Sequence, residues 1–130
     1  MTVSENKKLV QGLFEESGSF VDALADDVRW TVMGTTVFSD TYRGKQDVLK
    51  RLFGPLMEQL VSPGRMTVQN LVAEGDFVVV QAQASDRLTK TGQPYNNTYC
   101  MVMKIVDGKV TELDEYADTE LVTSAFGPRK

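Results

Sequence analysis

The stretch YNNTYCMVMKIVDGKVTELDEYAD, residues 95–118, decides the fold, because it has the features of a long β-hairpin. Its two halves are rich in residues that favour strands, and they flank Asp107–Gly108. Asp-Gly between two such runs is a strong signal for a two-residue hairpin turn. The sequence therefore predicts adjacent antiparallel strands over residues 95–106 and 109–118.

The residues before this hairpin predict further strands. RMTVQNLVAEG (65–75) and DFVVVQAQASDRL (76–88) indicate a second hairpin, with a tight turn near Gly75–Asp76. Apolar and polar residues alternate in DDVRWTVMG (26–34), as expected of a half-buried strand. VFSDTYRG (37–44) forms another extended segment. Most of the chain is thus predicted to form one sheet.

The strongest helix signal lies at residues 45–61, where apolar side chains recur on one wide face. Pro55 lies inside this segment, and proline removes a backbone donor and clashes one turn back. We therefore expect a kink near Arg51. The sequence SPG at residues 62–64 is expected to end the helix.

Two shorter helices are expected near the N-terminus, with Ser4 and Ser19 as their N-caps and SGS at residues 17–19 between them. The tail from residue 123 to 130 is expected to be irregular. Helices that group against one antiparallel sheet make an α+β fold. With no repeat or linker, residues 1–130 are predicted to form a single domain.

The composition excludes several classes of function. A net charge of −4 argues against nucleic-acid and anionic-membrane partners, since both require a basic face. No apolar run approaches the length of a membrane span. The N-terminus lacks the apolar core of a signal peptide, so we expect a cytoplasmic protein.

The chain contains no histidine and a single cysteine, Cys100. An internal disulfide is impossible, and a zinc or other transition-metal site is not expected. Catalytic groups built on imidazole are also excluded. Any acid–base chemistry must come from Asp, Glu, Tyr, Lys or a polarised water, and we expect neither a metal nor a cofactor.

Three segments, LADDVRWTVMG (24–34), YRGKQDVL (42–49) and the C-terminal hairpin with its extension (95–122), together resemble the nuclear-transport-factor-2-like superfamily. Within it, they are similar to SnoaL-like polyketide cyclases and limonene-epoxide-hydrolase-like proteins. The resemblance implies a cone, in which a curved antiparallel sheet wraps around three helices and leaves an apolar pocket. It also implies a homodimer formed through the outer face of the sheet.

Strand alternation places Glu115 on the opposite face from its acidic neighbours Glu112 and Asp114. The resemblance puts Glu115 at the position of the catalytic aspartate of the epoxide-hydrolase-like branch. Burial among apolar residues is expected to raise the pKa of this carboxyl group. We predict Glu115 as the catalytic residue. The resemblance to the same branch implies substrate-binding positions at Trp30, Gln83, Asn97, Tyr99, Met101 and Ala117.

The remaining positions of the related catalytic sets are not kept. That branch has an arginine and a second aspartate on the strand where this chain offers Gln81, Gln83 and Ser85, and of the two glutamines we favour Gln83. Val32 replaces a residue that holds water there. The known epoxide-hydrolase mechanism therefore does not carry over to this chain.

Three functions stay open at this point. The chain is an isomerase, cyclase or hydrolase that acts on a hydrophobic small molecule through Glu115, a non-catalytic binding domain, or an interaction protein organised as a homodimer. In the second and third cases, Glu115 is a structural carboxylate and Trp30 fills the core. Asn97 and Tyr99 are then polar residues satisfied by the protein itself. Fold alone does not choose among these functions.

Overall fold

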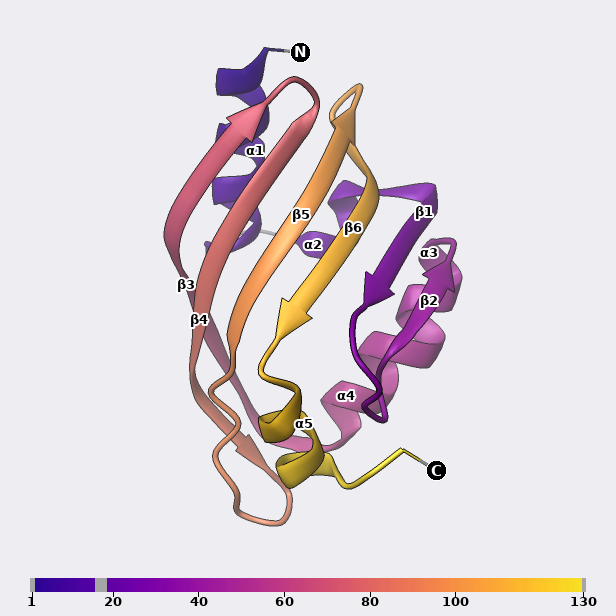
Figure 1. The fold of residues 1–130 in the computed structure, drawn as a ribbon, viewed down its shortest axis with the longest axis vertical. Coiled ribbons are helices and arrows are strands. Elements are labelled where there is room, and N and C mark those ends of the chain that lie inside the picture. Colours follow the sequence, from indigo (N-terminus) through magenta and orange to yellow (C-terminus); the bar gives the residue numbers. More distant parts are fainter. Residues whose placement is uncertain (1, 16–18, 130) are drawn as a thin grey trace.

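The computed structural model describes residues 2–15 and 19–129, in which six strands form one curved sheet (Figure 1). The order across the sheet is β2-β1-β6-β5-β4-β3. The expected α+β fold is confirmed. The strands are β1 (Leu24–Val32), β2 (Asp40–Arg43), β3 (Leu60–Glu74), β4 (Phe77–Thr89), β5 (Thr98–Val106) and β6 (Lys109–Ala117).

The β5–β6 hairpin forms as predicted. Asp107 and Gly108 have φ angles of 49° and 77°, and positive φ at both turn positions matches the right-handed twist of the flanking strands. Met101 lies opposite Glu115, and Tyr99 lies opposite Ala117. Opposed residues share a face of the sheet, so the predicted inward face of this hairpin is confirmed.

Neighbouring strands pair antiparallel except for β1 and β6, which run parallel. The wholly antiparallel sheet expected from the resemblance is wrong at this one pair. A parallel pair needs a long connection, and the chain between β1 and β6 supplies it. The register sets Trp30 beside Leu113 and Val32 beside Glu115.

Helices cover one side of the sheet (Figure 1). Helix α1 (Val3–Leu13) packs against β3 and β4, and the segment from α3 (Lys45–Asp47) to α4 (Gly54–Glu58) packs against β1, β2 and β3. The core lies between these helices and the sheet, where Val10, Leu113 and Met103 are completely buried. Within the described residues, none of the helices has the length and apolarity that a membrane-spanning helix requires.

The N-terminal helices are capped at one expected and one unexpected residue. Ser19 caps α2 (Phe20–Ala23) as predicted, with its hydroxyl accepting from the backbone N–H of Asp22. The expectation of Ser4 as the first cap is wrong. Thr2 caps α1 through a reciprocal pair of hydrogen bonds with Glu5, which satisfies two otherwise free backbone donors. Of the SGS segment, residues 17 and 18 lie outside the described residues.

The helix expected at residues 45–61 is interrupted, as Pro55 predicts. It divides into α3 (Lys45–Asp47), a π-helical turn (Val48–Phe53) and α4 (Gly54–Glu58). The N–H of Gly54 bonds the carbonyl of Leu49, five residues back, which is the π-helical pattern. This widened turn accommodates the proline that follows it.

The C-terminal limit of that helix differs from the prediction. The helix ends at Glu58, and β3 begins at Leu60 and continues through Pro63 and Gly64. Because β3 is an edge strand, it tolerates a proline that cannot donate to a neighbouring strand. The SPG sequence is therefore the start of a strand and not a helix stop.

The tail is partly helical, so its prediction as irregular is wrong. Asp118 caps helix α5 (Thr119–Phe126), and its carboxylate accepts from the N–H groups of Glu120 and Leu121. Phe126 then packs edge-on against Phe38 and Tyr95, with ring centroids 5.2 and 4.6 Å away. Capping and aromatic packing together stabilise a segment too short to form a helix alone.

Replacement of Asp118 by Ala is expected to lower the free energy of unfolding by about 1 kcal/mol, because two N–H groups of α5 lose their acceptor. Urea unfolding followed by circular dichroism measures this change. Asp27→Ala is the control, since Asp27 is an exposed residue on β1. Equal stability of the two variants would contradict the capping role.

Candidate functional site

A cavity of about 250 Å³ lies between the sheet and the segment that contains the π-helical turn and α4. Three polar side chains, those of Arg87, Tyr99 and Glu115, belong to its wall. The rest of the lining is apolar, which is typical of a site for a small organic molecule. Apolar residues in the wall include Phe20, Trp30, Leu52, Phe53, Met66 and Met101.

Glu115 is the only carboxylate that residues 2–15 and 19–129 contribute to this wall. The indole Nε1 of Trp30 donates a hydrogen bond to its Oε1 over 3.3 Å. Among the described residues, no other side chain hydrogen-bonds this carboxyl group. Its second oxygen is therefore left for water or a ligand.

Burial raises the pKa of Glu115 to about 7. The Trp30 hydrogen bond and the positive charge of Arg87 act in the opposite direction, but desolvation is the larger effect. Although the carboxyl group lies deep in the protein, Glu115 keeps partial accessibility because it borders the cavity. Both protonation states are therefore available near neutral pH, as general acid–base catalysis requires.

Tyr99 supplies a buried hydroxyl to the same cavity. This hydroxyl accepts a hydrogen bond from Nη1 of Arg87 over 3.3 Å and donates one to the hydroxyl of Tyr95 over 3.5 Å. Burial raises the pKa of Tyr99 well above its usual range. The hydroxyl therefore keeps its proton. Donation of that proton to a carbonyl or water in the cavity would replace the long hydrogen bond to Tyr95.

Arg87 was not predicted from the sequence. Strand alternation turns Val80, Ala82 and Ala84 toward the core, and its continuation would leave Arg87 on the outside. A bend intervenes, because Asp86 has a φ of 57° and Gly64, opposite it on β3, has a φ of 61°. Beyond this bend Arg87 reaches the cavity. The alternation of apolar and polar residues in the sequence does not predict that Arg87 changes to the inner face of the sheet.

The placement of Gln83 in the pocket is wrong. In the β4–β5 register, Ala82 lies opposite Tyr99, so Gln83 shares the outer face with Thr98. Its amide donates to the carbonyl oxygens of Asn96 and Asn97, over 2.8 and 3.2 Å, and it accepts from the Thr98 hydroxyl. The side-chain amide of Gln83 therefore hydrogen-bonds within the protein and does not face a ligand.

Asn97 also lies away from the cavity wall. It is fully buried, and its Oδ1 accepts from the N–H groups of Thr98 and Asp118 over 2.8 and 3.1 Å. Its Nδ2 donates to the carbonyl of Asp118 over 3.1 Å. Asn97 thus connects the start of β5 to the start of α5. This agrees with the alternative that Asn97 is a polar residue whose hydrogen bonds are all made within the protein.

The other predicted residues gather around Glu115. Trp30, Tyr99 and Met101 border the main cavity with it. Ala117 borders an adjoining hollow of about 40 Å³, which Tyr99 and Glu115 also line. No group of three or more potential metal-ligating side chains gathers within the part of the chain that the structure describes.

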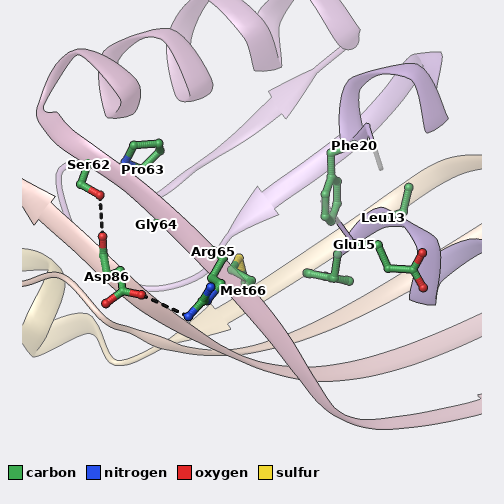
Figure 2. A pocket seen from close by; sticks show the side chains of 10 residues that line it. Leu13, Glu15, Phe20, Ser62, Pro63, Gly64, Arg65, Met66 and Asp86 are labelled. Atoms are coloured by element: carbon green, nitrogen blue, oxygen red, sulfur yellow. Dashed lines mark hydrogen bonds and ion pairs between the residues drawn. The ribbon is translucent and has the colours of Figure 1, made fainter. Parts of the chain in front are cut away.

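A larger hollow, of about 670 Å³, lies between the end of α1 and the first part of β3. Figure 2 shows the side chains that line it. Phe20 and Met66 line both this groove and the cavity, so the two adjoin. The groove carries an exposed ion pair, in which Arg65 lies 3.5 Å from Asp86. It offers room next to the cavity for a longer ligand.

Residues 16–113 match the SnoaL-like domain family. The chain belongs to this family. The match covers most of the sequence, including β1 and β5, and it confirms the resemblance seen in the sequence. No curated protein matches this SnoaL-like chain.

Solved structures resemble the SnoaL-like chain over almost its whole length. An NTF2-like protein from Burkholderia thailandensis E264 has a TM-score of 0.80 at 21% identity, covering 98% of this chain and 100% of that one. A proposed SnoaL-like polyketide cyclase from Jannaschia sp. CCS1 has a TM-score of 0.73 at 21% identity, covering 95% and 92%. A proposed ketosteroid isomerase from Kribbella flavida has a TM-score of 0.65 at 21% identity, covering 89% and 79%. At these identities the likeness shows the shared fold.

The raised pKa of Glu115 has a consequence for stability. Between the ordinary pKa of 4.5 and about 7, the folded state holds a proton that the unfolded state releases, so rising pH lowers the free energy of unfolding. Glutamine has no carboxyl proton to release, so Glu115→Gln is not destabilised as the pH rises. At pH 8 its free energy of unfolding is expected to exceed that of the wild type by on the order of 2 kcal/mol.

Urea unfolding of the wild type and Glu115→Gln at pH 5 and pH 8 measures this effect. The difference between the two proteins is expected to widen at the higher pH. Glu74→Gln, at an exposed position near the end of β3, is the matched control and is expected to show no such widening. A constant difference would show that Glu115 is ionised in the folded protein at pH 5.

Proposed function

We propose that this SnoaL-like protein is an enzyme that transfers protons on a hydrophobic small molecule, with Glu115 as the acid–base group. One observation carries the proposal: a buried carboxyl group with one unbonded oxygen faces an apolar cavity beside a protonated tyrosine hydroxyl. Isomerisation and aldol-type cyclisation both begin with removal of a proton next to a carbonyl. The family and its neighbours named as a cyclase and an isomerase are consistent with this chemistry.

In this mechanism, the Glu115 carboxylate takes the proton from the carbon next to the substrate carbonyl. The Tyr99 hydroxyl donates to the carbonyl oxygen as negative charge develops there, which is the role of an oxyanion-stabilising group. The hydrogen bond from Arg87 makes this hydroxyl a better donor. The Trp30 N–H holds Glu115 in place during the transfer. Returning the proton to another atom of the substrate completes an isomerisation.

Deuterium exchange tests proton transfer without knowledge of the natural substrate. In D₂O the protein is expected to accelerate exchange at the carbons next to the carbonyl of 2-tetralone, an apolar ketone, and NMR measures the rate. Glu115→Gln is expected to lose at least about 100-fold of the acceleration, because general-base catalysis contributes 10²- to 10⁴-fold. The wild-type rate is expected to rise with pH and to level off above about 7, where Glu115 is ionised.

Exchange in Glu115→Gln equal to that of the wild type would remove Glu115 from the mechanism. Binding of the ketone without any acceleration of exchange would favour the alternative, a non-catalytic ligand-binding domain of the same fold. Glu112→Gln is a control on the outer face of the same strand, where Glu112 pairs with Arg29.

We also propose that the protein forms a homodimer through the outer face of the sheet. Val102 and Cys100 on β5 are only half-buried, and Tyr116 on β6 is 46% exposed. These side chains supply apolar surface at the centre of that face. Association would bury it.

Light scattering at micromolar concentration is expected to give twice the mass of the chain. Val102→Glu is expected to shift the protein to monomer, because it would place a charge in the interface. Val61→Glu is the control, since Val61 is 65% exposed at the start of the edge strand β3. A monomeric wild type would contradict the dimer.

A further inference from the structure

We infer that Arg87 is a specificity-determining residue, which binds a carboxylate carried by the apolar ligand of the main cavity. This inference rests on the proposed function, in that it requires the cavity to hold a small molecule. It adds the chemical class of that molecule, an amphipathic acid with an apolar body and one anionic group. The Arg87 guanidinium forms no ion pair within the described part of the chain, and the inference rests on this observation.

The hydrogen bonds of Arg87 leave much of its guanidinium unused. Its Nε donates to the carbonyl of Pro63 over 2.9 Å, and its Nη1 donates to the hydroxyl of Tyr99 over 3.3 Å. Nη2 has no hydrogen-bond partner among residues 2–15 and 19–129. Because both existing acceptors are neutral, the positive charge is not neutralised by either contact.

No carboxylate of the described residues forms an ion pair with Arg87 within 4.0 Å. Glu115 shares the cavity wall with Arg87 but stays beyond this distance. The neighbouring arginine on β3 differs, since Arg65 pairs with Asp86 (Figure 2). Arg87, which faces the cavity, is therefore the one of these two arginines that is available to bind an external anion.

A cation in an apolar wall is costly without a partner. Arg87 is only half-exposed, and most of the surrounding wall is aliphatic or aromatic, so its charge is partly desolvated. The two hydrogen bonds hold the guanidinium in a fixed position, which lowers the entropy cost of binding an anion. A ligand whose negative charge lies against the free Nη2 edge of the Arg87 guanidinium compensates for the hydration that this group loses in the cavity wall.

The wall favours a carboxylate over a phosphate. Arg87 is the only cationic side chain among the described residues of the wall, and one guanidinium matches the single charge and planar oxygens of a carboxylate. A phosphate carries more charge and more acceptor oxygens than this site can satisfy. The apolar remainder of the wall accepts the body of the ligand.

Trp30, the sole tryptophan of the chain, borders the cavity and reports binding through its fluorescence. The probes are 4-phenylbutanoate and 4-phenylbutanamide, which have the same shape and differ in charge. At pH 6, the wild type is expected to bind the carboxylate at least about tenfold more tightly than the amide, as charge-assisted hydrogen bonds predict.

Arg87→Met is expected to abolish this preference and to leave the affinity for the amide within about threefold of the wild type. Arg65→Met is the matched control and is expected to keep the full preference, because Arg65 lies in the outer groove. Arg87→Lys keeps the charge but loses the planar fork, so it is expected to keep a smaller preference. Circular dichroism verifies that each variant is folded.

Equal binding of the two probes by the wild type would overturn the inference, and this result needs no variant. A preference that survives in folded Arg87→Met would overturn it as well. Glu115→Gln separates the two proposals, since it is expected to lose deuterium exchange and to keep the carboxylate preference. Loss of the preference in Glu115→Gln would contradict the assignment of anion binding to Arg87 alone.

Discussion

The parallel pairing of β1 with β6 is the constraint on which the site depends. It sets Trp30 beside Leu113 and Val32 beside Glu115, in a sheet whose other pairs are antiparallel. From this position the Trp30 indole reaches the Glu115 carboxyl group and donates to it. Without this pair the acid would lack its hydrogen-bond donor, and the cavity would lose one wall. A buried carboxyl group is tolerated here because burial raises its pKa and one donor remains.

The polar groups of the cavity come from three adjacent strands and are held by contacts outside it. Arg87 on β4 is fixed by the carbonyl of Pro63, and its Nη1 in turn donates to Tyr99 on β5. Asn97 fastens the beginning of β5 to the backbone of Asp118, just beyond β6. Such supporting contacts keep a site rigid, and rigid positioning is what both catalysis and selective binding require. The apolar wall strengthens each electrostatic contact made inside it.

Much of the fold was predictable because it depends on local patterns. The Asp107–Gly108 turn and strand alternation were sufficient to place Glu115, Tyr99 and Met101 on one face. Pro55 likewise announced the break in its helix. Helix α5 was missed because its stability comes from the Asp118 cap and from Phe126 packing on distant aromatic rings. Gln83 was misplaced for a different reason, because alternation along β4 turns Val80, Ala82 and Ala84 to the core and Gln83 to the outer face.

The sequence by itself determined the α+β class, the C-terminal hairpin and the inward direction of Glu115, because strand period and turn chemistry are local properties. Only the tertiary structure decided what surrounds that carboxyl group. The parallel β1–β6 pair brought Trp30 to it, and the bend at Asp86 and Gly64 turned Arg87 into the same cavity. Both depend on contacts between residues far apart in the chain, and no local pattern encodes them.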